Sequence, residues 1–361
     1  MAPGQIAIIG TVGLPARYGG FETLAAELVR AAARRDQAHR LTIWCSALQT
    51  GHPRPDSYLG ARLRYLPLQA NGAQSIPYDA LSLLQAARNG HGTALVLGVS
   101  GGMALPMLRG LSDMRIITHL DGLDWQRRKW GGVARAVLRR SEALAVRWSN
   151  EVIADNPEIA ADVRCRHGRA AVEIAYGHET PPPGDLPGDL PPRYALAVAR
   201  AEPENNLALL LDTFADAAPP LPLVAIANWQ ATRHGRRLCA RYSGRPGLQL
   251  RAAEYDPARL AAIRAGAALY LHGHSAGGTN PSLVAMMGLG SPIAAFDCRF
   301  NRATTEGRAA YFDSPETLRA SVYQLIAPET AAANSGALQQ IARRRYRWRD
   351  VTDAYFDLLG L

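Results

Sequence analysis

The sequence predicts an α/β protein of two domains, each built around a parallel sheet. The chain of 361 residues is longer than a single hydrophobic core usually supports. Short apolar runs alternate with amphipathic segments in two successive series, which is typical of parallel strands connected by helices. A stretch rich in proline and glycine, residues 180–192, separates the two series and is the predicted linker.

The first predicted domain covers residues 1–180 and opens with a Rossmann-type unit. An apolar strand over 5–9 is followed by a glycine-rich loop over 10–20 and an amphipathic helix over 21–35. Leu24, Leu28 and Ala32 share one face of that helix. Further strands are predicted at 41–45, 62–67, 94–98, 115–119 and 151–154.

The second predicted domain covers residues 190–342, where the strand–helix pattern restarts. Strands are expected at 194–199, 222–227, 248–251 and 268–272, and helices at 207–217, 232–242, 257–265 and from Pro281 onward. From Gly336 the chain is predicted to be helical to its end. Apolar residues at helical spacing, such as Val351, Tyr355 and Leu358, lead us to expect that segment 343–361 packs back on the first domain.

Charge and composition limit the function classes. Apolar residues make up 48% of the chain and charged residues 20%, as in a folded globular protein. The net charge of +9 comes almost entirely from arginine, since Lys129 is the single lysine. A basic protein favours anionic partners: nucleic acid, an anionic membrane or a phosphorylated substrate. Nucleic acid is not expected, because the chain has no zinc-ligand spacing, RNA-binding aromatic pattern or recognition helix.

The cysteines indicate the compartment. Cys45, Cys165, Cys239 and Cys298 are scattered, without a Cys-x-x-Cys pair, so neither a disulfide framework nor a metal site is predicted. We therefore expect a reducing cytoplasm. No apolar stretch is long enough to span a bilayer, so the protein is expected to be soluble or attached peripherally at the inner face of the plasma membrane.

The first candidate site is the loop GTVGLPARYGGFE, residues 10–22. Gly13, Gly19 and Gly20 allow backbone N–H groups to approach a ligand closely, and the helix beginning near Phe21 directs its positive end toward an anion. A phosphate group suits this loop; the alternative is a tight turn without a ligand. The spacing differs from Gly-x-Gly-x-x-Gly, which argues against NAD.

The second candidate is HGHSAGGTNPSL, residues 272–283, between a strand and a helix. Its glycines free the backbone and its polar residues supply neutral donors, which together make a second anion-binding turn. Asn280 could instead simply cap the helix that begins at Pro281. His272 and His274 suggest a metal only weakly, since no carboxylate accompanies them.

Two more loops follow predicted strands. Arg200, directly after the first strand of the second domain, can bind a diphosphate with its planar guanidinium and stabilise charge on a leaving phosphate. Its neighbour Glu204 is expected to cap the next helix. In the first domain, His119 and Asp121 follow a strand and could contact a transferred sugar or orient an acceptor hydroxyl; alternatively, His119 is structural.

A basic stripe follows these residues. It comprises Arg127, Arg128, Lys129, Arg135, Arg139, Arg140 and Arg147, with Trp125 and Trp130 beside them. The stripe is either a solvated helix face or a surface for an anionic membrane or a lipid diphosphate.

These motifs resemble family 4 of the GT-B glycosyltransferases, and within it the rhamnosyltransferase-like subgroup of bacterial polysaccharide assembly. The resemblance rests on residues 10–22, 272–283, DGLDWQR at 121–127, EPENN at 202–206 and FNR at 300–302, which follow the family's order along nearly the whole chain. It implies two Rossmann-like domains facing across a cleft that holds the donor diphosphate.

The resemblance also implies an activity: metal-independent transfer of a sugar, with retained anomeric configuration, to a hydroxyl of a growing glycan. The implied donor is dTDP-rhamnose, with a UDP- or GDP-sugar as the alternative, and the acceptor is a glycan or a lipid-diphosphate-linked glycan. No cofactor is expected besides this substrate.

The resemblance assigns roles residue by residue. The implied catalytic residues are His119, Asp121 and Arg200. The implied donor-binding residues are Gly13, Gly19, Gly20, Phe21, Arg200, Asn205, Tyr255, Gly277, Gly278, Thr279, Asn280, Ser282 and Leu283. The implied acceptor-binding residues are Glu22, Asp124, Trp125 and Arg127.

The chain departs from the family pattern at three positions. A pair of glutamates is usual around the second glycine turn, where this chain has Gly277 and Ala285, and the usual lysine after the arginine is Asn205. The subgroup commonly has glycine at the first position, but Ala285 cannot accept a hydrogen bond from the nucleoside sugar. A catalytically silent sugar-nucleotide-binding protein or assembly partner is therefore the second hypothesis, and a sugar-nucleotide epimerase is the third.

Overall fold

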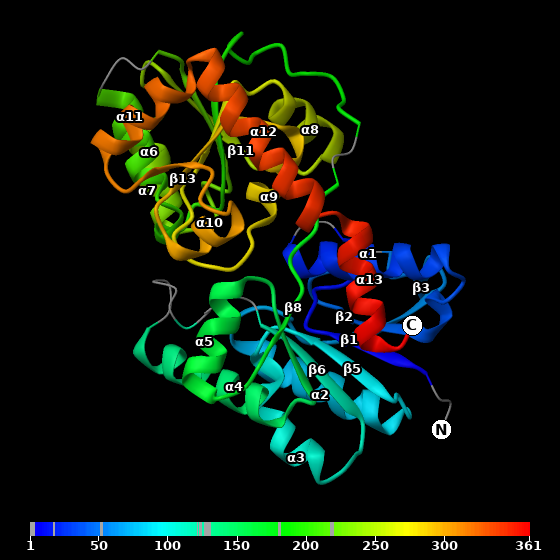
Figure 1. Cartoon of the computed structure of the whole chain (residues 1–361). Coiled ribbons are helices and arrows are strands. Elements are labelled where there is room, and N and C mark those ends of the chain that lie inside the picture. Colours follow the sequence, from blue (N-terminus) through cyan, green and yellow to red (C-terminus); the bar gives the residue numbers. More distant parts are fainter. Residues whose placement is uncertain are drawn as a thin grey trace. The chain divides into compact units, whose positions relative to one another are not determined.

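The computed structural model describes residues 4–16, 19–50, 53–120, 122, 125, 131–179, 182–216 and 220–361. They form two compact units (Figure 1). The first unit contains the described residues up to Tyr176 together with Trp348–Leu361, and the second contains Gly177–Arg347. The chain therefore passes from one unit to the other near residue 176 and returns near residue 347.

The sheet of the first unit has the strand order β3-β4-β2-β1-β5-β6-β7-β8. Its strands are β1 (Ile6–Ile9), β2 (Leu41–Ser46), β3 (Ser57–Tyr58), β4 (Ala61–Leu66), β5 (Thr93–Leu97), β6 (Arg115–Leu120), β7 (Glu151–Ala154) and β8 (Val172–Glu173). Only the short β3 pairs in the antiparallel sense. Strands β1 and β2 are buried along their whole length, as expected for central strands with both faces covered.

The helices of the first unit are α1 (Gly20–Arg34), α2 (Ser75–Arg88), α3 (Leu105–Arg109), α4 (Gly132–Trp148), α5 (Pro157–His167) and α13 (Trp348–Leu359). Leu24 and Leu28 of α1 join a core that also holds Val351, Tyr355 and Phe356 of α13. Figure 1 shows α13 beside α1. The C-terminal helix thus packs on the first unit, as predicted, because its apolar face completes that core.

The sheet of the second unit has the order β11-β10-β9-β12-β13-β14. Its strands are β9 (Ala195–Val198), β10 (Leu223–Ala227), β11 (Leu248–Ala252), β12 (Leu269–His272), β13 (Ile293–Phe296) and β14 (Ala310–Phe312), all parallel. Its helices are α6 (Leu207–Asp216), α7 (Arg233–Tyr242), α8 (Pro257–Ala265), α9 (Pro281–Leu289), α10 (Arg299–Thr304), α11 (Pro315–Leu325) and α12 (Pro328–Arg345).

Both sheets have a topological switch point, where ligands of open α/β proteins usually bind. In the first unit the strand order reverses between β1 and β5, and in the second between β9 and β12. The loops after β1, β9 and β12 are, in that order, the glycine-rich loop that begins at Gly10, the loop with Arg200, and the turn over 273–280. The fold therefore places three predicted motifs at switch points.

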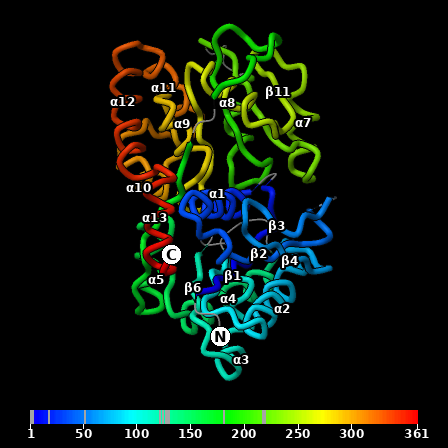
Figure 2. Tube along the Cα trace, turned by 90° about the vertical axis from the view of Figure 1, so that its right-hand side faces the viewer, coloured from blue at the N-terminus to red at the C-terminus, as the bar shows by residue number. Residues whose placement is uncertain are grey.

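The prediction of one helix from Gly336 to the end is wrong. Helix α12 begins earlier, at Pro328, and ends at Arg345, and α13 starts at Trp348 (Figure 2 shows α12 beside α9). The break arises because the His178 N–H donates to the Tyr346 carbonyl at 2.7 Å and His178 forms a parallel bridge with Arg347. The predicted C-terminal segment 343–361 accordingly divides, since residues up to Arg347 belong to the second unit.

Candidate functional site

Two loops of the second unit are bonded to each other at the switch point. The Ser275 N–H and hydroxyl both donate to the Glu204 carbonyl, at 2.9 and 2.8 Å. The Asn206 amide donates to the Gly273 carbonyl at 2.9 Å. A Cβ at Gly273 would lie 2.3 Å from the Asn205 carbonyl oxygen, so only glycine allows this approach. The loop after β9 and the loop after β12 therefore form one structure.

Arg200 lies on this joined structure with its side chain exposed. The Asn205 amide donates to the Arg200 carbonyl at 2.8 Å, and the neighbouring Ala201 N–H donates to Asn228 at 2.9 Å. Asn205, which is 6% exposed, thus fixes the backbone that carries the guanidinium. Within the described parts of the chain, the Arg200 side chain has no hydrogen bond or ion pair and can bind an anion.

The glycine turn leads into the N-terminus of α9. Gly277 has φ of 121°, a conformation that favours glycine. Asn280 caps the helix by accepting the Ser282 N–H at 2.9 Å, and no acidic residue lies in the first turn. Thr279 is buried, whereas Gly278 and Ser282 are half-buried. The first-turn N–H groups are already used, since Pro281 has none and both Ser282 and Leu283 donate to Asn280. An anion at this helix end would be attracted by the partial positive charge of the helix N-terminus.

Two further predicted donor residues have different environments. Leu283 is fully buried in the core, and its backbone N–H donates to the Asn280 carbonyl. Tyr255, after β11, is 59% exposed.

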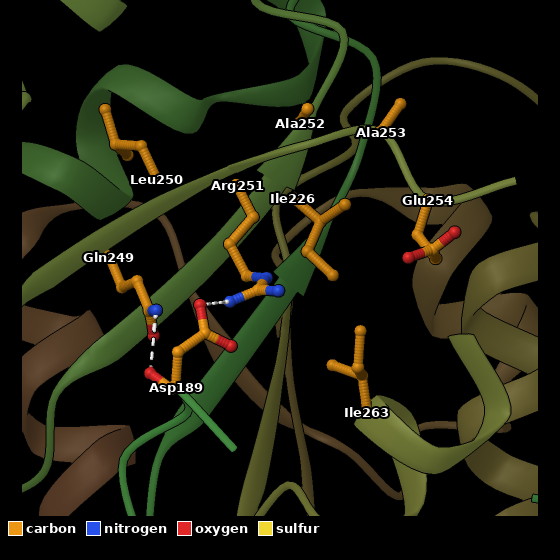
Figure 3. A pocket seen from close by; sticks show the side chains of 9 residues that line it. All are labelled: Asp189, Ile226, Gln249, Leu250, Arg251, Ala252, Ala253, Glu254 and Ile263. Carbon is orange, nitrogen blue, oxygen red and sulfur yellow. Dashed lines mark hydrogen bonds and ion pairs between the residues drawn. The ribbon is translucent and has the colours of Figure 1, made fainter. Parts of the chain in front are cut away.

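An open pocket of about 340 Å³ lies between β10, β11 and α8 of the second unit (Figure 3), and Glu254, the residue before Tyr255, lines it. Glu254, Ile226 and Ile263 line it, and Arg251 donates to Asp189 across it at 2.5 Å. Charged and aliphatic side chains line the pocket together.

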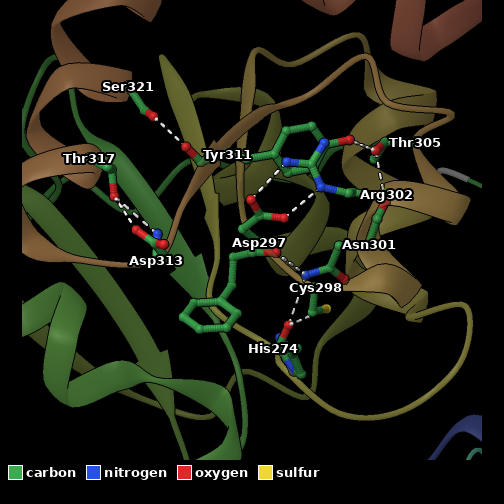
Figure 4. A network of polar contacts seen from close by, with 11 residues as sticks. His274, Asp297, Cys298, Asn301, Arg302, Thr305, Tyr311, Asp313, Thr317 and Ser321 are labelled. Carbon is green, nitrogen blue, oxygen red and sulfur yellow. Dashed lines mark hydrogen bonds and ion pairs between the residues drawn. The ribbon is translucent and has the colours of Figure 1, made fainter.

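The two histidines after β12 stack on each other, with ring centroids 4.4 Å apart. His272 is fully buried, and this burial lowers its pKa well below the usual value, so the imidazole is neutral. The His274 carbonyl accepts the Asn301 amide at 2.8 Å in the polar network of Figure 4. Among the residues given coordinates, no group of three or more His, Cys, Asp or Glu side chains could hold a metal ion.

In the first unit, the glycine-rich loop encloses a carboxylate. The Val12 N–H donates to Glu22 Oε1 at 2.7 Å, and a Cβ at Gly19 would lie 1.8 Å from Glu22 Oε2. Gly13 has φ of 135° and packs against Cys45. Glu22, expected to bind the acceptor, therefore also stabilises the loop. Gly20 and Phe21 begin α1, and their N–H groups lie in its first turn.

His119 is the next-to-last residue of the buried strand β6 and is 4% exposed. Its ring lies edge-on to Phe21 at 5.3 Å and to Tyr355 of α13 at 6.2 Å. The Gly98 N–H donates to the His119 carbonyl at 2.8 Å. His119 is thus packed among aromatic side chains near the switch point. Asp121, the other predicted catalytic residue of this segment, lies outside the described residues.

Trp125 is held by charged side chains. Its indole N–H donates to Glu142 at 3.0 Å, and the guanidinium groups of Arg139 and Arg166 lie 5.5 and 5.2 Å from its ring centroid. Glu142 is almost fully buried. These contacts anchor Trp125 on α4. The predicted acceptor residues Asp124 and Arg127 are outside the described part of the chain.

The sequence analysis missed a third glycine loop, over residues 98–102 after β5. A Cβ at Gly102 would lie 2.1 Å from the Ser141 carbonyl oxygen, and the Ser141 hydroxyl donates to Val99 at 2.6 Å. The Ser100 hydroxyl lies 3.0 Å from that of Ser75. The loop borders the β1–β5 switch point. The available signal was the pair of adjacent glycines directly after an apolar strand.

We compared the chain with known protein families, curated proteins and solved structures. Residues 4–179 match a family described as a domain of unknown function (DUF1972). No curated protein matches the sequence. In the part of the chain that the structure describes, no helix is both long and apolar enough to cross a membrane.

Solved structures match along the whole chain. Sucrose-phosphate synthase from Thermosynechococcus elongatus has a TM-score of 0.82 at 16% identity, with 98% of each chain covered. HepE from Anabaena, solved with UDP-glucose, has a TM-score of 0.71 at 13% identity, with 99% of each chain covered. The catalytic domain of starch synthase IV from Arabidopsis thaliana, bound to ADP and acarbose, has a TM-score of 0.71 at 13% identity, covering 99% of this chain and 98% of that one. The chain therefore has the GT-B fold of these enzymes.

Proposed function

We propose that the protein is a retaining glycosyltransferase that takes its sugar from a nucleotide donor. The observation that carries the proposal is the hydrogen-bonded pair of loops in the second unit, which brings the exposed Arg200 and the N-terminus of α9 to one switch point. A guanidinium and a helix N-terminus are both suited to a diphosphate. The solved structures of similar fold include one bound to UDP-glucose and one bound to ADP.

The chemistry follows from charge. Transfer breaks the bond between the anomeric carbon and the donor diphosphate and forms a bond from that carbon to the acceptor oxygen, whose proton passes to the departing phosphate oxygen. Negative charge develops on the leaving group during the transfer. Arg200 and the positive end of α9 stabilise this charge, which lowers the barrier for bond cleavage. In this proposal the diphosphate lies on Gly277, Gly278, Thr279 and Ser282, and the nucleoside contacts Tyr255.

The proposed donor is dTDP-rhamnose, on the strength of the sequence resemblance. UDP- and GDP-sugars are the alternatives. Ala285, on α9, removes the carboxylate that usually contacts the nucleoside sugar in that family. Loss of one charge-assisted hydrogen bond costs about 1.5–3 kcal/mol, so donor affinity falls roughly ten- to hundredfold relative to a site that retains the carboxylate.

We place acceptor binding on the first unit. The proposed acceptor is a hydroxyl of a growing glycan, free or carried on a lipid diphosphate. His119 and Asp121 orient the transferred sugar or the acceptor hydroxyl, and Glu22, Asp124, Trp125 and Arg127 contribute to acceptor binding. The glycine-rich loop with Gly13, Gly19, Gly20 and Phe21 completes the donor contacts. No metal or cofactor has a role in this proposal.

We also propose that the protein works at the cytoplasmic face of the plasma membrane. Met107 of α3 is exposed, as are Met103 just before the helix and Leu111 just after it, Leu111 by 65%. Helix α3 packs against α4, which carries the exposed Arg139 and Arg140 of the basic stripe. Exposed apolar and cationic side chains together suit an anionic bilayer.

Co-sedimentation with vesicles tests this membrane proposal. The protein should pellet with vesicles that contain phosphatidylglycerol and not with pure phosphatidylcholine, and Met107→Ser with Leu111→Ser should weaken the binding. Equal pelleting with both lipids, or none, would contradict it.

The function is tested in two steps. A thermal-shift titration with dTDP-rhamnose, UDP-sugars and GDP-sugars identifies the nucleotide, since a ligand that binds the folded state raises the melting temperature. The sugar nucleotide that gives the largest shift is then incubated with the protein and the release of free nucleotide is measured. Stabilisation by at least one sugar nucleotide, followed by nucleotide release, is the expected result. No stabilisation by any of them would refute the proposal.

Ala285 motivates a second candidate, a catalytically silent protein that binds sugar nucleotides or serves as an assembly partner. This candidate predicts binding without donor hydrolysis or transfer. Turnover that persists in the purified wild type and is lost in Arg200→Ala would reject it.

A further inference from the structure

A second arginine lies at the first turn of α9. Arg264 of α8 donates from Nη2 to the Ser282 hydroxyl at 3.5 Å. The Nε atom of Arg264 is buried and has no hydrogen-bond partner. Among the described residues, no carboxylate pairs with this guanidinium, and the one titratable side chain that acts on it is the neutral Tyr270 phenol. Desolvation lowers the pKa of Arg264, as expected for a cation removed from water without a counter-ion.

The groups around Arg264 are neutral, and several of their hydrogen bonds are long. The Tyr270 hydroxyl is 3.5 Å from the Val198 carbonyl and 3.4 Å from His272 Nδ1, and it also hydrogen-bonds Ser282. His272 is fully buried, and its Nε2 has no partner. Hydrogen bonds of normal strength between such groups are about 2.7–3.0 Å long. This polar cluster is therefore not satisfied by its own members.

The Arg264 guanidinium lies at a helix N-terminus, which adds to the uncompensated positive charge. The N-terminus of a helix carries partial positive charge, so a cation at the first turn is unfavourable and an anion is favourable. The first turn of α9 contains no acidic residue. Ala285, one turn further along, is half-buried and offers no carboxylate. Two positive features thus meet at Ser282 without a negative group in the described structure.

We propose that Arg264 and Ser282 bind a phosphoryl group at the first turn of α9, so that Arg264 is a second cation of the donor site beside Arg200. The inference rests on the proposed function, and it adds a positioning residue from a different element, α8. A phosphoryl group has several acceptor oxygens and negative charge, which match the guanidinium, the two hydroxyls and the helix N-terminus.

The test uses Arg264→Met and Arg264→Lys in the full chain, with Arg259→Met as the matched control. Arg259 lies on the same helix, and its side chain is 58% exposed. Isothermal titration with dTDP, UDP, thymidine, uridine and inorganic pyrophosphate separates phosphoryl binding from nucleoside binding. Arg264→Met should lose about ten- to hundredfold in affinity for the diphosphates and pyrophosphate, with nucleoside affinity unchanged. Arg264→Lys should lose less, and Arg259→Met should match the wild type.

The outcomes separate the inference from the proposed function. If the wild type binds dTDP or UDP and Arg264→Met binds it equally well, the inference is wrong and the proposed function stands. If the wild type binds pyrophosphate through Arg264 but no nucleotide, the anion site is supported and the proposed function fails. Equal losses for nucleosides and diphosphates would show a merely structural role.

A measurement on the wild type covers the case in which Arg264→Met does not fold. The NMR signal of the Arg264 Nε–H should shift when pyrophosphate is added. An unmoved signal at saturating pyrophosphate would overturn the inference.

Discussion

Substituting Gly288 with alanine should show how closely His178, at the first of the two crossings between the units, packs on α9. A Cβ at Gly288 would lie 1.9 Å from His178 Cε1 and within 2.5 Å of both ring nitrogens. Carbon atoms pack at about 3.5–4.0 Å, so the ring would have to retreat by roughly 1.6 Å or more. His178 is restrained by its backbone bonds to the segment at 346–347, and burial lowers the pKa of its ring, which is neutral.

Two opposing effects determine how Gly288→Ala changes the free energy of unfolding. Replacing glycine by alanine inside a helix gains about 0.5–1 kcal/mol, whereas overpacking costs about 1–3 kcal/mol. Gly336 in α12 is the matched control, since a Cβ there meets nothing within 4 Å. Gly336→Ala should therefore stabilise the protein by about 0.5–1 kcal/mol, and Gly288→Ala should be less stable than this control by about 1–3 kcal/mol.

Urea-induced unfolding followed by circular dichroism measures both variants. Adding His178→Ala to Gly288→Ala should remove the clash, and the double-mutant cycle should give a coupling free energy of about 1–3 kcal/mol. Equal stabilisation by Gly288→Ala and Gly336→Ala would show that the His178 ring does not rest on Gly288, and would refute the reasoning.

Two further predictions concern a buried acid and a loop contact. Burial raises the pKa of Asp79 well above its usual 3.8, so the folded state favours the protonated carboxyl. The free energy of unfolding is therefore highest at low pH and falls as the pH rises above 3.8. Urea unfolding across this range should show Asp79→Asn gaining on the wild type toward neutral pH; a constant difference would contradict the prediction. Gly273→Ala places a methyl group 2.3 Å from the Asn205 carbonyl oxygen and should weaken nucleotide binding about tenfold or more, whereas Gly336→Ala should not. If Gly273→Ala binds nucleotide as tightly as the wild type in titration, the contact between the loops after β9 and β12 is not needed for binding.

Much of the fold could be predicted from local patterns. Apolar strands followed by glycine loops predicted β1, β9 and β12 within a residue or two, because a buried parallel strand and the loop after it are specified by adjacent residues. The turn over 277–280 was likewise visible, since glycine, asparagine and proline have positional meaning at a helix start. The strands β13 and β14 were missed, because runs of three or four apolar residues also occur in buried helices.

Other features depend on residues that are distant in sequence. The break between α12 and α13 comes from pairing with His178, which helical periodicity cannot predict. The enclosure of Glu22 by its own loop depends on the exact path of Val12. Arg264 looks like an ordinary surface arginine in the sequence, and the role proposed for it depends on the lack of a carboxylate partner among the described residues.

The central claim is that the second unit binds a nucleotide diphosphate through Arg200 and the N-terminus of α9. Isothermal titration of the wild type and of Arg200→Ala with dTDP and UDP tests it most directly. Arg200→Ala should bind about ten- to hundredfold more weakly, because it loses a charge-assisted contact to the diphosphate. The same affinity in both proteins, with turnover unchanged, would contradict the claim.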